Sequence, residues 1–143
     1  MMLKLYILPI LILISLHDLN FRKIPNTLLY GLFVMAFTSD ISADFYNIPL
    51  KILAGLFFTG LLAAIAKFSK GLGFGDVKLI GILGYCCGFF QTLLICIMAC
   101  IMGIMASLIL YRLNEKKQRN PIPFAPFLTA GYAISEVIGG WLR

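Results

Sequence analysis

The stretch that decides the fold is VKLIGILGYCCGFFQTLLICIMACIMGIMASLILY, from Val77 to Tyr111. Its only charged residue is Lys78. The stretch is much longer than the roughly 20 residues with which one helix crosses a bilayer. The chain therefore has to reverse direction once within it, and the segment Gly88 to Gln91 is the expected place. This predicts two apolar helices joined by a tight hairpin.

Polar breaks in the apolar runs predict four further helices along the rest of the chain. The segment from Met1 to Leu16 has the apolar character of a secretory signal, but no small-residue cleavage site follows it, so we expect it to be retained as the first helix. The four expected helices cover approximately Leu3–Leu16, Asn26–Phe37, Pro49–Phe68 and Pro121–Trp141. Polar or glycine-rich loops are expected at residues 17–25, 38–44, 71–75 and 112–120.

The composition predicts an integral membrane protein. Hydrophobic residues make up 61% of the chain and charged residues 13%, whereas soluble domains have about 45–50% and about 25%. In lipid every backbone group must be bonded within a helix or a closed barrel, so 143 residues leave room for about six short spans and no separate soluble domain. We therefore expect an all-α membrane protein, a polytopic bundle of about six transmembrane helices, with residues 1–143 forming a single domain.

The cations gather on one side of this predicted topology. Lys4, Lys51 and Arg143 lie on the opposite side. Since short cytoplasmic loops are enriched in Lys and Arg, we expect the amino terminus outside and the turns after the first, third and fifth helices in the cytoplasm. The net charge of +6 then reflects contact with anionic lipid headgroups and not with nucleic acid. Nine of the twelve cations lie on the cytoplasmic side: Arg22, Lys23, Lys67, Lys70, Lys78, Arg112, Lys116, Lys117 and Arg119.

Two aspartates stand at helix ends on this cytoplasmic side. Asp18 precedes a proline-bounded turn, and Asp76 lies in Gly73-Phe74-Gly75-Asp76-Val77-Lys78. Glycine at positions 73 and 75 removes side chains from the approach to Asp76 and permits positive φ angles. Either acid alone is typical of a solvated helix end. Two carboxylates close together can share one proton, so that one takes a proton from water while the other polarises a carbonyl.

Three motifs together resemble the type IV prepilin peptidases, which are membrane aspartyl proteases of the Gly-x-Gly-Asp type. The resemblance implies that Asp18 and Asp76 are the catalytic pair. It also implies cleavage of a short basic leader from prepilin or type II secretion pseudopilin precursors, at the cytoplasmic face of the bacterial inner membrane. The motifs are Asp18 followed by Arg22-Lys23-Ile24-Pro25-Asn26, the segment of residues 73–78, and Pro121-Ile122-Pro123-Phe124-Ala125-Pro126-Phe127 before the last helix.

Five further residues are expected to bind substrate or shape the site. They are Gly73, Gly75, Lys78, Pro25 and Asn26. Lys78 is not expected to pair with Asp76, because residues two apart face different sides of a helix. Contact with lipid headgroups is its expected role.

The cysteines do not form the zinc-binding pattern of larger relatives, which carry two Cys-x-x-Cys pairs in a cytoplasmic loop. Here the cysteines lie within the predicted apolar helices, where thiols are usually packing residues. We therefore expect no metal and no other cofactor. The sequence also lacks a nucleotide fingerprint, so it does not favour N-methyltransferase activity. The four cysteines are Cys86, Cys87, Cys96 and Cys100.

Small residues predict how the two helices of the long apolar stretch pack. Gly84 and Gly88 are spaced by four residues, as are Ala99 and Gly103. Such pairs allow close helix packing. We expect them to bring the two helices against each other.

Other functions and some residue roles stay open at this stage. A small ion- or proton-coupled transporter could use Asp18 and Asp76 to bind cations, but it predicts acids near the bilayer midplane and two similar halves. A non-catalytic partner in secretion is a third possibility. His17 could orient Asp18 or simply end a helix, and Glu136 could cap, line a cavity or pair with Lys51.

Overall fold

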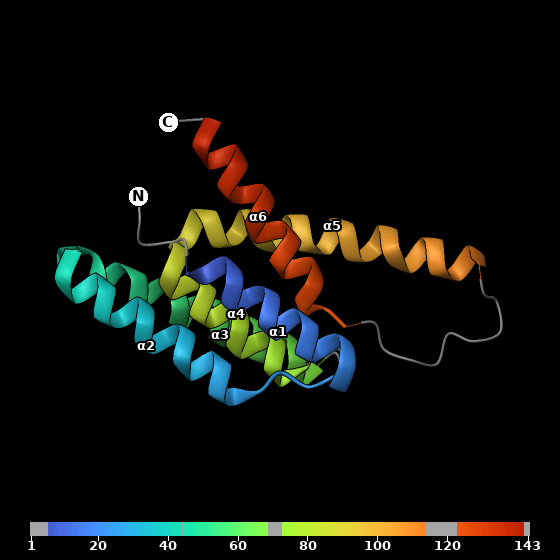
Figure 1. Ribbon diagram of the computed structural model, residues 1–143, viewed down its shortest axis with the longest axis horizontal. Helices are drawn as coiled ribbons and strands as arrows, with labels where there is room; N and C mark the ends of the chain where they lie inside the picture. The colour runs from blue at the N-terminus through green and yellow to red at the C-terminus, as the bar shows by residue number, and fades with distance from the viewer. Residues whose placement is uncertain (1–5, 44, 69–72, 114–122, 142–143) are drawn as a thin grey trace.

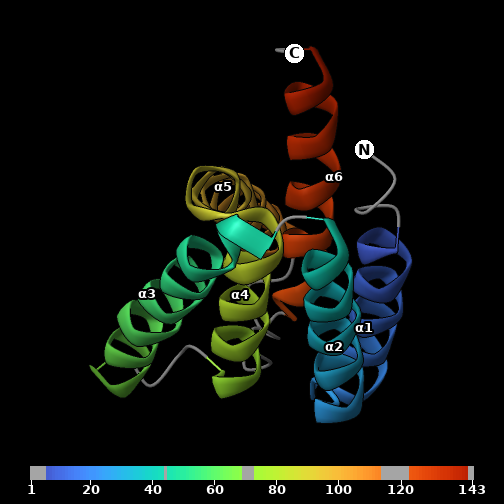
Figure 2. The same ribbon diagram turned by 90° about the vertical axis from the view of Figure 1, so that its left-hand side faces the viewer.

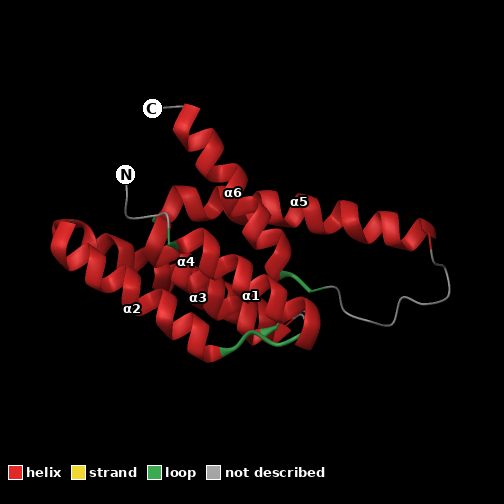
Figure 3. Ribbon diagram, viewed as in Figure 1, coloured by secondary structure: helices red, strands yellow, loops and turns green. Residues whose placement is uncertain are grey.

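The computed structural model describes residues 6–43, 45–68, 73–113 and 123–141 (Figure 1). Within these ranges the chain forms helices and no strand (Figure 3). The predicted all-α class is confirmed, whereas the number of membrane crossings and the orientation stay predictions. The elements are α1 (Ile7–Phe21), α2 (Asn26–Ala43), the short 3-10 helix η2 (Phe45–Asn47), α3 (Ile48–Phe68), α4 (Phe74–Cys87), α5 (Phe89–Leu113) and α6 (Ala125–Trp141).

Helix α1 was predicted to end with its apolar run at Leu16, but it continues to Phe21. Asp18 therefore lies within the last turn of the helix and not in a polar loop. Arg22 ends the helix in the left-handed conformation (φ 52°), and its N–H donates to Asp18 O at 2.8 Å. Polar side chains at a helix end do not break backbone hydrogen bonds, so the helix stops where the backbone reverses and not where hydrophobicity falls.

The predicted polar loop at residues 38–44 is wrong for residues 38–43, since α2 runs to Ala43. Thr38 Oγ1 donates to Val34 O at 2.9 Å, and Ser39 Oγ donates to Ala36 O at 2.8 Å. Bonds of this kind satisfy hydroxyl groups inside a helix. Residue 44 and the predicted start of the last helix at residues 121–122 lie outside the described ranges.

The reversal predicted between residues 88 and 91 takes place at one residue, Gly88. Its φ is +80°, a conformation that favours glycine, and its N–H donates to Gly84 O at 3.0 Å. Thr92 Oγ1 then donates to Leu83 O at 3.0 Å across the corner. In Figure 2, α5 is seen end-on while α1, α2 and α4 are seen from the side, so α5 crosses these helices steeply.

The small residues pack different helices from those predicted. A Cβ added at Gly84 of α4 would lie 3.1 Å from Gly55 Cα of α3. On α5, Ala99 N lies 3.4 Å from the position of a Cβ added at Gly131 of α6. The predicted α4–α5 packing through these residues is therefore wrong, because the corner at Gly88 carries α5 across the bundle. Gly81 and Gly84 of α4 contact α3, and α5 contacts α6.

Apolar side chains cover the outside of the molecule as well as its core. Leu13, Leu53 and Ile104, on three different helices, are each more than half exposed. Large exposed apolar surfaces of this kind are typical of contact with lipid. The segments Phe45–Phe68 and Phe89–Ile109 are long and apolar enough to cross a membrane, and Ile7–Phe21 and Ala125–Ile138 are shorter apolar helices.

Gly131→Ala is expected to destabilise the fold by about 1–3 kcal/mol. The added Cβ would lie 2.8 Å from Ile95 O, a backbone atom that moves only if α5 moves with it. Gly60→Ala is the matched control, since a Cβ there meets nothing within 4 Å, and should be neutral or stabilise by up to about 1 kcal/mol. Thermal unfolding of both variants in one detergent measures the difference. Equal stabilities would contradict this α5–α6 contact.

Candidate active site

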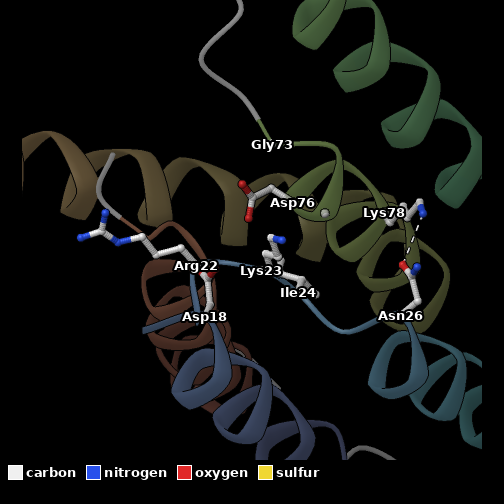
Figure 4. A pocket seen from close by; sticks show the side chains of 9 residues that line it. Asp18, Arg22, Lys23, Ile24, Asn26, Gly73, Asp76 and Lys78 are labelled. Carbon is white, nitrogen blue, oxygen red and sulfur yellow. Dashed lines mark hydrogen bonds between the residues drawn. The ribbon is translucent and has the colours of Figure 1, made fainter. Parts of the chain in front are cut away.

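Two carboxylates from different helices line one open pocket of about 310 Å³. Asp18 comes from the last turn of α1 and Asp76 from the first turn of α4 (Figure 4). Six of the seven site residues predicted from the sequence line this pocket, and Pro25 does not. The full lining is Asp18, Arg22, Lys23, Ile24, Asn26, Gly73, Gly75, Asp76 and Lys78.

The Asp18 side chain is only 7% exposed and lies against the start of α6. Its Oδ2 accepts a hydrogen bond from the backbone N–H of Ala125 at 3.3 Å. Ala125 is the first residue of α6, and N–H groups in the first turn of a helix have no acceptor within that helix. The partial positive charge of a helix start also favours a carboxylate. Residues 107 positions apart in the chain thus form one half of the site.

Asp76 folds back over the start of its own helix. Gly73 precedes α4 with extended backbone (φ −70°, ψ 137°), and its backbone makes a hydrogen bond with the Asp76 carboxylate. A Cβ at Gly73 would lie 3.2 Å from Asp76 Oδ2, which is tight contact. Glycine at 73 therefore leaves room for this carboxylate. The positive φ expected at positions 73 and 75 is not found.

The environment of Asp76 disfavours its charged form. Burial and, to a smaller extent, the neighbouring charge of Asp18 raise the pKa of Asp76 to about 6, against the opposing effect of the hydrogen bond with the Gly73 backbone. Asp76 lies at the end of α4, outside the segments long enough to span a membrane. The two acids can therefore share one proton under mildly acidic conditions, with Asp76 carrying it.

The connector between α1 and α2 supplies three lining residues that were not predicted as site residues: Arg22, Lys23 and Ile24. The signal was present in the sequence, because these residues closely follow Asp18. A Cβ at Gly75 would lie 3.2 Å from Ile24 Cβ, so the chain's own connector occupies the space that glycine leaves there. The left-handed conformation of Arg22, uncommon outside glycine, turns the connector towards α4.

The other predicted site residues hold the start of α2. Lys78 Nζ donates to Asn26 Oδ1 at 3.3 Å, which joins α4 to α2. Pro25 lies just outside the pocket, and its carbonyl accepts the N–H of Leu29 at 3.4 Å. Both contacts fix the direction in which the chain leaves the site.

The sequence left the roles of His17 and Glu136 open, and the structure shows a side-chain hydrogen bond for each. His17 Nδ1 donates to Lys23 O at 2.9 Å, so it supports the connector. Glu136 Oε1 accepts from Gln91 Nε2 at 2.6 Å. Lys51, which the sequence offered as one possible partner of Glu136, pairs with Asp40 at 2.6 Å.

The cysteines lie away from the pocket, on α4 and α5, and none of the four is in a disulfide bond. Within the described ranges, no three His, Cys, Asp or Glu side chains come together as metal ligands would. The lining of the pocket offers carboxylates, cations, the Asn26 amide and backbone groups.

The sequence matches the type IV leader peptidase family over residues 5–108. The chain belongs to this family. Its relatives in the type IV leader peptidase family include the prepilin leader peptidase/N-methyltransferase of Bacillus subtilis, 29% identical over 133 residues that cover 91% of this chain and 53% of that protein. The proteins of the same name from Pectobacterium carotovorum and Pseudomonas aeruginosa are each 25% identical, covering 96% and 92% of this chain and 51% and 45% of theirs.

This chain spans about half the length of the curated relatives it matches. No solved structure matches it. The family match includes both Asp18 and Asp76 but ends before α6, which begins at Ala125.

Proposed function

We propose that this chain is an aspartic endopeptidase of the bacterial inner membrane. It would remove the basic leader from prepilin or type II secretion pseudopilin precursors at the cytoplasmic face. The observation that carries the proposal is the pairing of Asp18 and Asp76, from two helices, in one open pocket where Asp76 has a raised pKa. Family membership and the names of the relatives support the substrate class.

The pair can carry out the proton transfers that peptide hydrolysis needs, two as the tetrahedral intermediate forms and two as it collapses. Asp18, ionised against the start of α6, accepts a proton from a water molecule as the water oxygen bonds to the scissile carbonyl carbon. Asp76 gives its proton to the carbonyl oxygen. When the tetrahedral intermediate collapses, the C–N bond breaks and the departing nitrogen takes the proton from Asp18. The remaining carboxyl product returns a proton to Asp76, so the pair ends in its starting state.

The position of the pocket suits a substrate that is partly in the membrane. The pocket lies at the ends of α1 and α4, while the outer faces of the helices are apolar. An apolar precursor helix can lie beside them with its leader at the pocket. Arg22, Lys23 and Lys78 stand beside the two acids, so the pocket itself does not attract a basic leader. The anionic bilayer surface supplies that attraction.

Purified protein in lipid nanodiscs, mixed with a synthetic precursor, tests the proposal. The precursor carries a basic leader followed by an apolar helix, and mass spectrometry identifies the products. We expect a single cut at the end of the leader. Ion flux through proteoliposomes without any cleavage would instead support the transporter, and the absence of both activities would support the non-catalytic partner.

A further inference from the structure

A polar contact links α1 and α6 one turn away from Asp18. Leu11, Ser15 and Asp18 lie on the same buried face of α1. Thr129 Oγ1 of α6 is within hydrogen-bond distance of Leu11 O (3.2 Å) and of Ala125 O (3.0 Å). Ser15 Oγ bonds to the same Thr129 oxygen. We call Ser15 and Thr129 the hydroxyl pair.

The hydrogen bonds of this contact determine which hydroxyl group donates and which accepts. A threonine hydroxyl has one proton and two lone pairs. Thr129 therefore shares its proton between the two carbonyls, and its oxygen accepts the proton of Ser15. Ser15 is 7% exposed, so losing the Thr129 hydroxyl would take away the acceptor of a buried serine hydroxyl. These hydrogen bonds fix the position of α6 along the axis of α1. The surrounding apolar contacts fix that position less specifically.

The hydroxyl pair acts on the same residue that meets Asp18. Thr129 bonds to the carbonyl of Ala125, and the N–H of Ala125 donates to Asp18 Oδ2. We propose that Ser15 and Thr129 are positioning residues, which hold the Asp18 carboxylate against the first amide of α6 and so set its place relative to Asp76. This inference rests on the proposed function, because it concerns the geometry of the same pair.

Among the described residues, the other buried serine and threonine side chains, Ser135 and Thr92, do not have this arrangement. Ser135 Oγ donates to Tyr132 O one turn earlier in α6, at 2.8 Å. Thr92 Oγ1 donates to Leu83 O across the α4–α5 corner, at 3.0 Å. Both satisfy a local backbone carbonyl. The hydroxyl pair differs because it joins two helices at a residue that contacts a site carboxylate.

Thr129→Val removes the hydroxyl with little change in volume. We expect kcat for the synthetic precursor to fall about 10- to 100-fold, since small misplacements of catalytic groups cost this much, with KM nearly unchanged. The alkaline limb of kcat/KM should also move to lower pH, because Asp18 then contributes less to the raised pKa of Asp76. Thr129→Ser keeps the hydroxyl and should restore most of kcat.

Thr92→Val is the matched control. It deletes a threonine hydroxyl that is fully buried, on another helix and away from the pocket. It should lower thermal stability while leaving kcat per folded molecule and the alkaline limb unchanged. The other charged groups at the pocket, Arg22, Lys23 and Lys78, are the same in all variants. A shift in the alkaline limb of kcat/KM in Thr129→Val therefore reports on the pair Asp18 and Asp76.

A second measurement needs no substrate. Carbon-13 NMR of the Asp76 Cγ in the resting protein should show a transition near pH 6, which moves to lower pH in Thr129→Val and stays in place in Thr92→Val. If Thr129→Val leaves this transition unmoved, the positioning role is overturned whether or not the chain cleaves precursors. If the transition moves but the unaltered chain cuts no precursor, the positioning geometry stands and the proposed peptidase function fails.

Discussion

Asp18→Asn and Asp76→Asn are each expected to stop leader removal, lowering the cleavage rate by about 10³-fold. Asparagine keeps the size of the side chain but can neither accept a proton from water nor give one to a carbonyl. In Asp18→Asn the amide oxygen of the new side chain can still accept the N–H of Ala125, so the packing of α1 against α6 should survive. Cleavage of the synthetic precursor, measured per folded molecule, tests both variants.

Glu136→Gln is the control for these exchanges. It also replaces an acid by its amide, but outside the pocket, and Gln91 can still donate to the retained side-chain oxygen. It should cleave at close to the normal rate. A second control comes from stability, because Asp76→Asn removes a carboxylate whose ionised form is disfavoured in the folded state. This variant should be at least as stable as the parent above pH 6. Near-normal cleavage by either aspartate variant would rule out the paired mechanism.

Much of the fold could be predicted from where the apolar runs break. Among the residues that the structure describes there are six α-helices, as the sequence predicted. The reversal at Gly88 and the position of Asp18 and Asp76 at one pocket also follow the prediction. Each depends on a strong local signal, such as a glycine at a corner or a long uncharged run. Helix ends were less predictable. The stretch at residues 38–43 is polar yet helical, because the hydroxyl groups of Thr38 and Ser39 bond to the preceding turn and Asp40 pairs with Lys51.

The parts of the site that were missed come from the backbone and from packing. The donor to Asp18 is the backbone N–H of Ala125. Almost every residue has such an N–H, so the residue type at position 125 could not predict this contact. Which helix each glycine contacts depends on the crossing angle of α5, which composition does not reveal. Ser15 and Thr129 are ordinary helix residues in the sequence. They become notable only when α1 and α6 lie side by side.

The pH dependence of cleavage is expected to follow the protonation of Asp76. With its pKa raised to about 6, the free protein loses the shared proton as the pH rises through this value. The ratio kcat/KM reports on the free enzyme, so it should fall about tenfold per pH unit above pH 6. Binding of the precursor covers the pocket and removes water, which favours the neutral form of Asp76 further. The alkaline limb of kcat should therefore lie at higher pH than the limb of kcat/KM.

Stability measurements separate the loss of cleavage caused by deprotonation of Asp76 from a loss caused by unfolding. The activity and the contribution of Asp76 to stability change in different pH ranges. Asp76 has its ordinary pKa of 3.8 in the unfolded chain and about 6 in the folded one, so the folded state binds more protons between these values. Its contribution to the free energy of unfolding is present below pH 3.8, declines as the pH rises towards 6 and then stays constant. Cleavage should fall above pH 6, where this contribution no longer changes. A cleavage rate that stayed level from pH 6 to 9 for both kcat and kcat/KM would show that Asp76 carries no proton needed for the reaction.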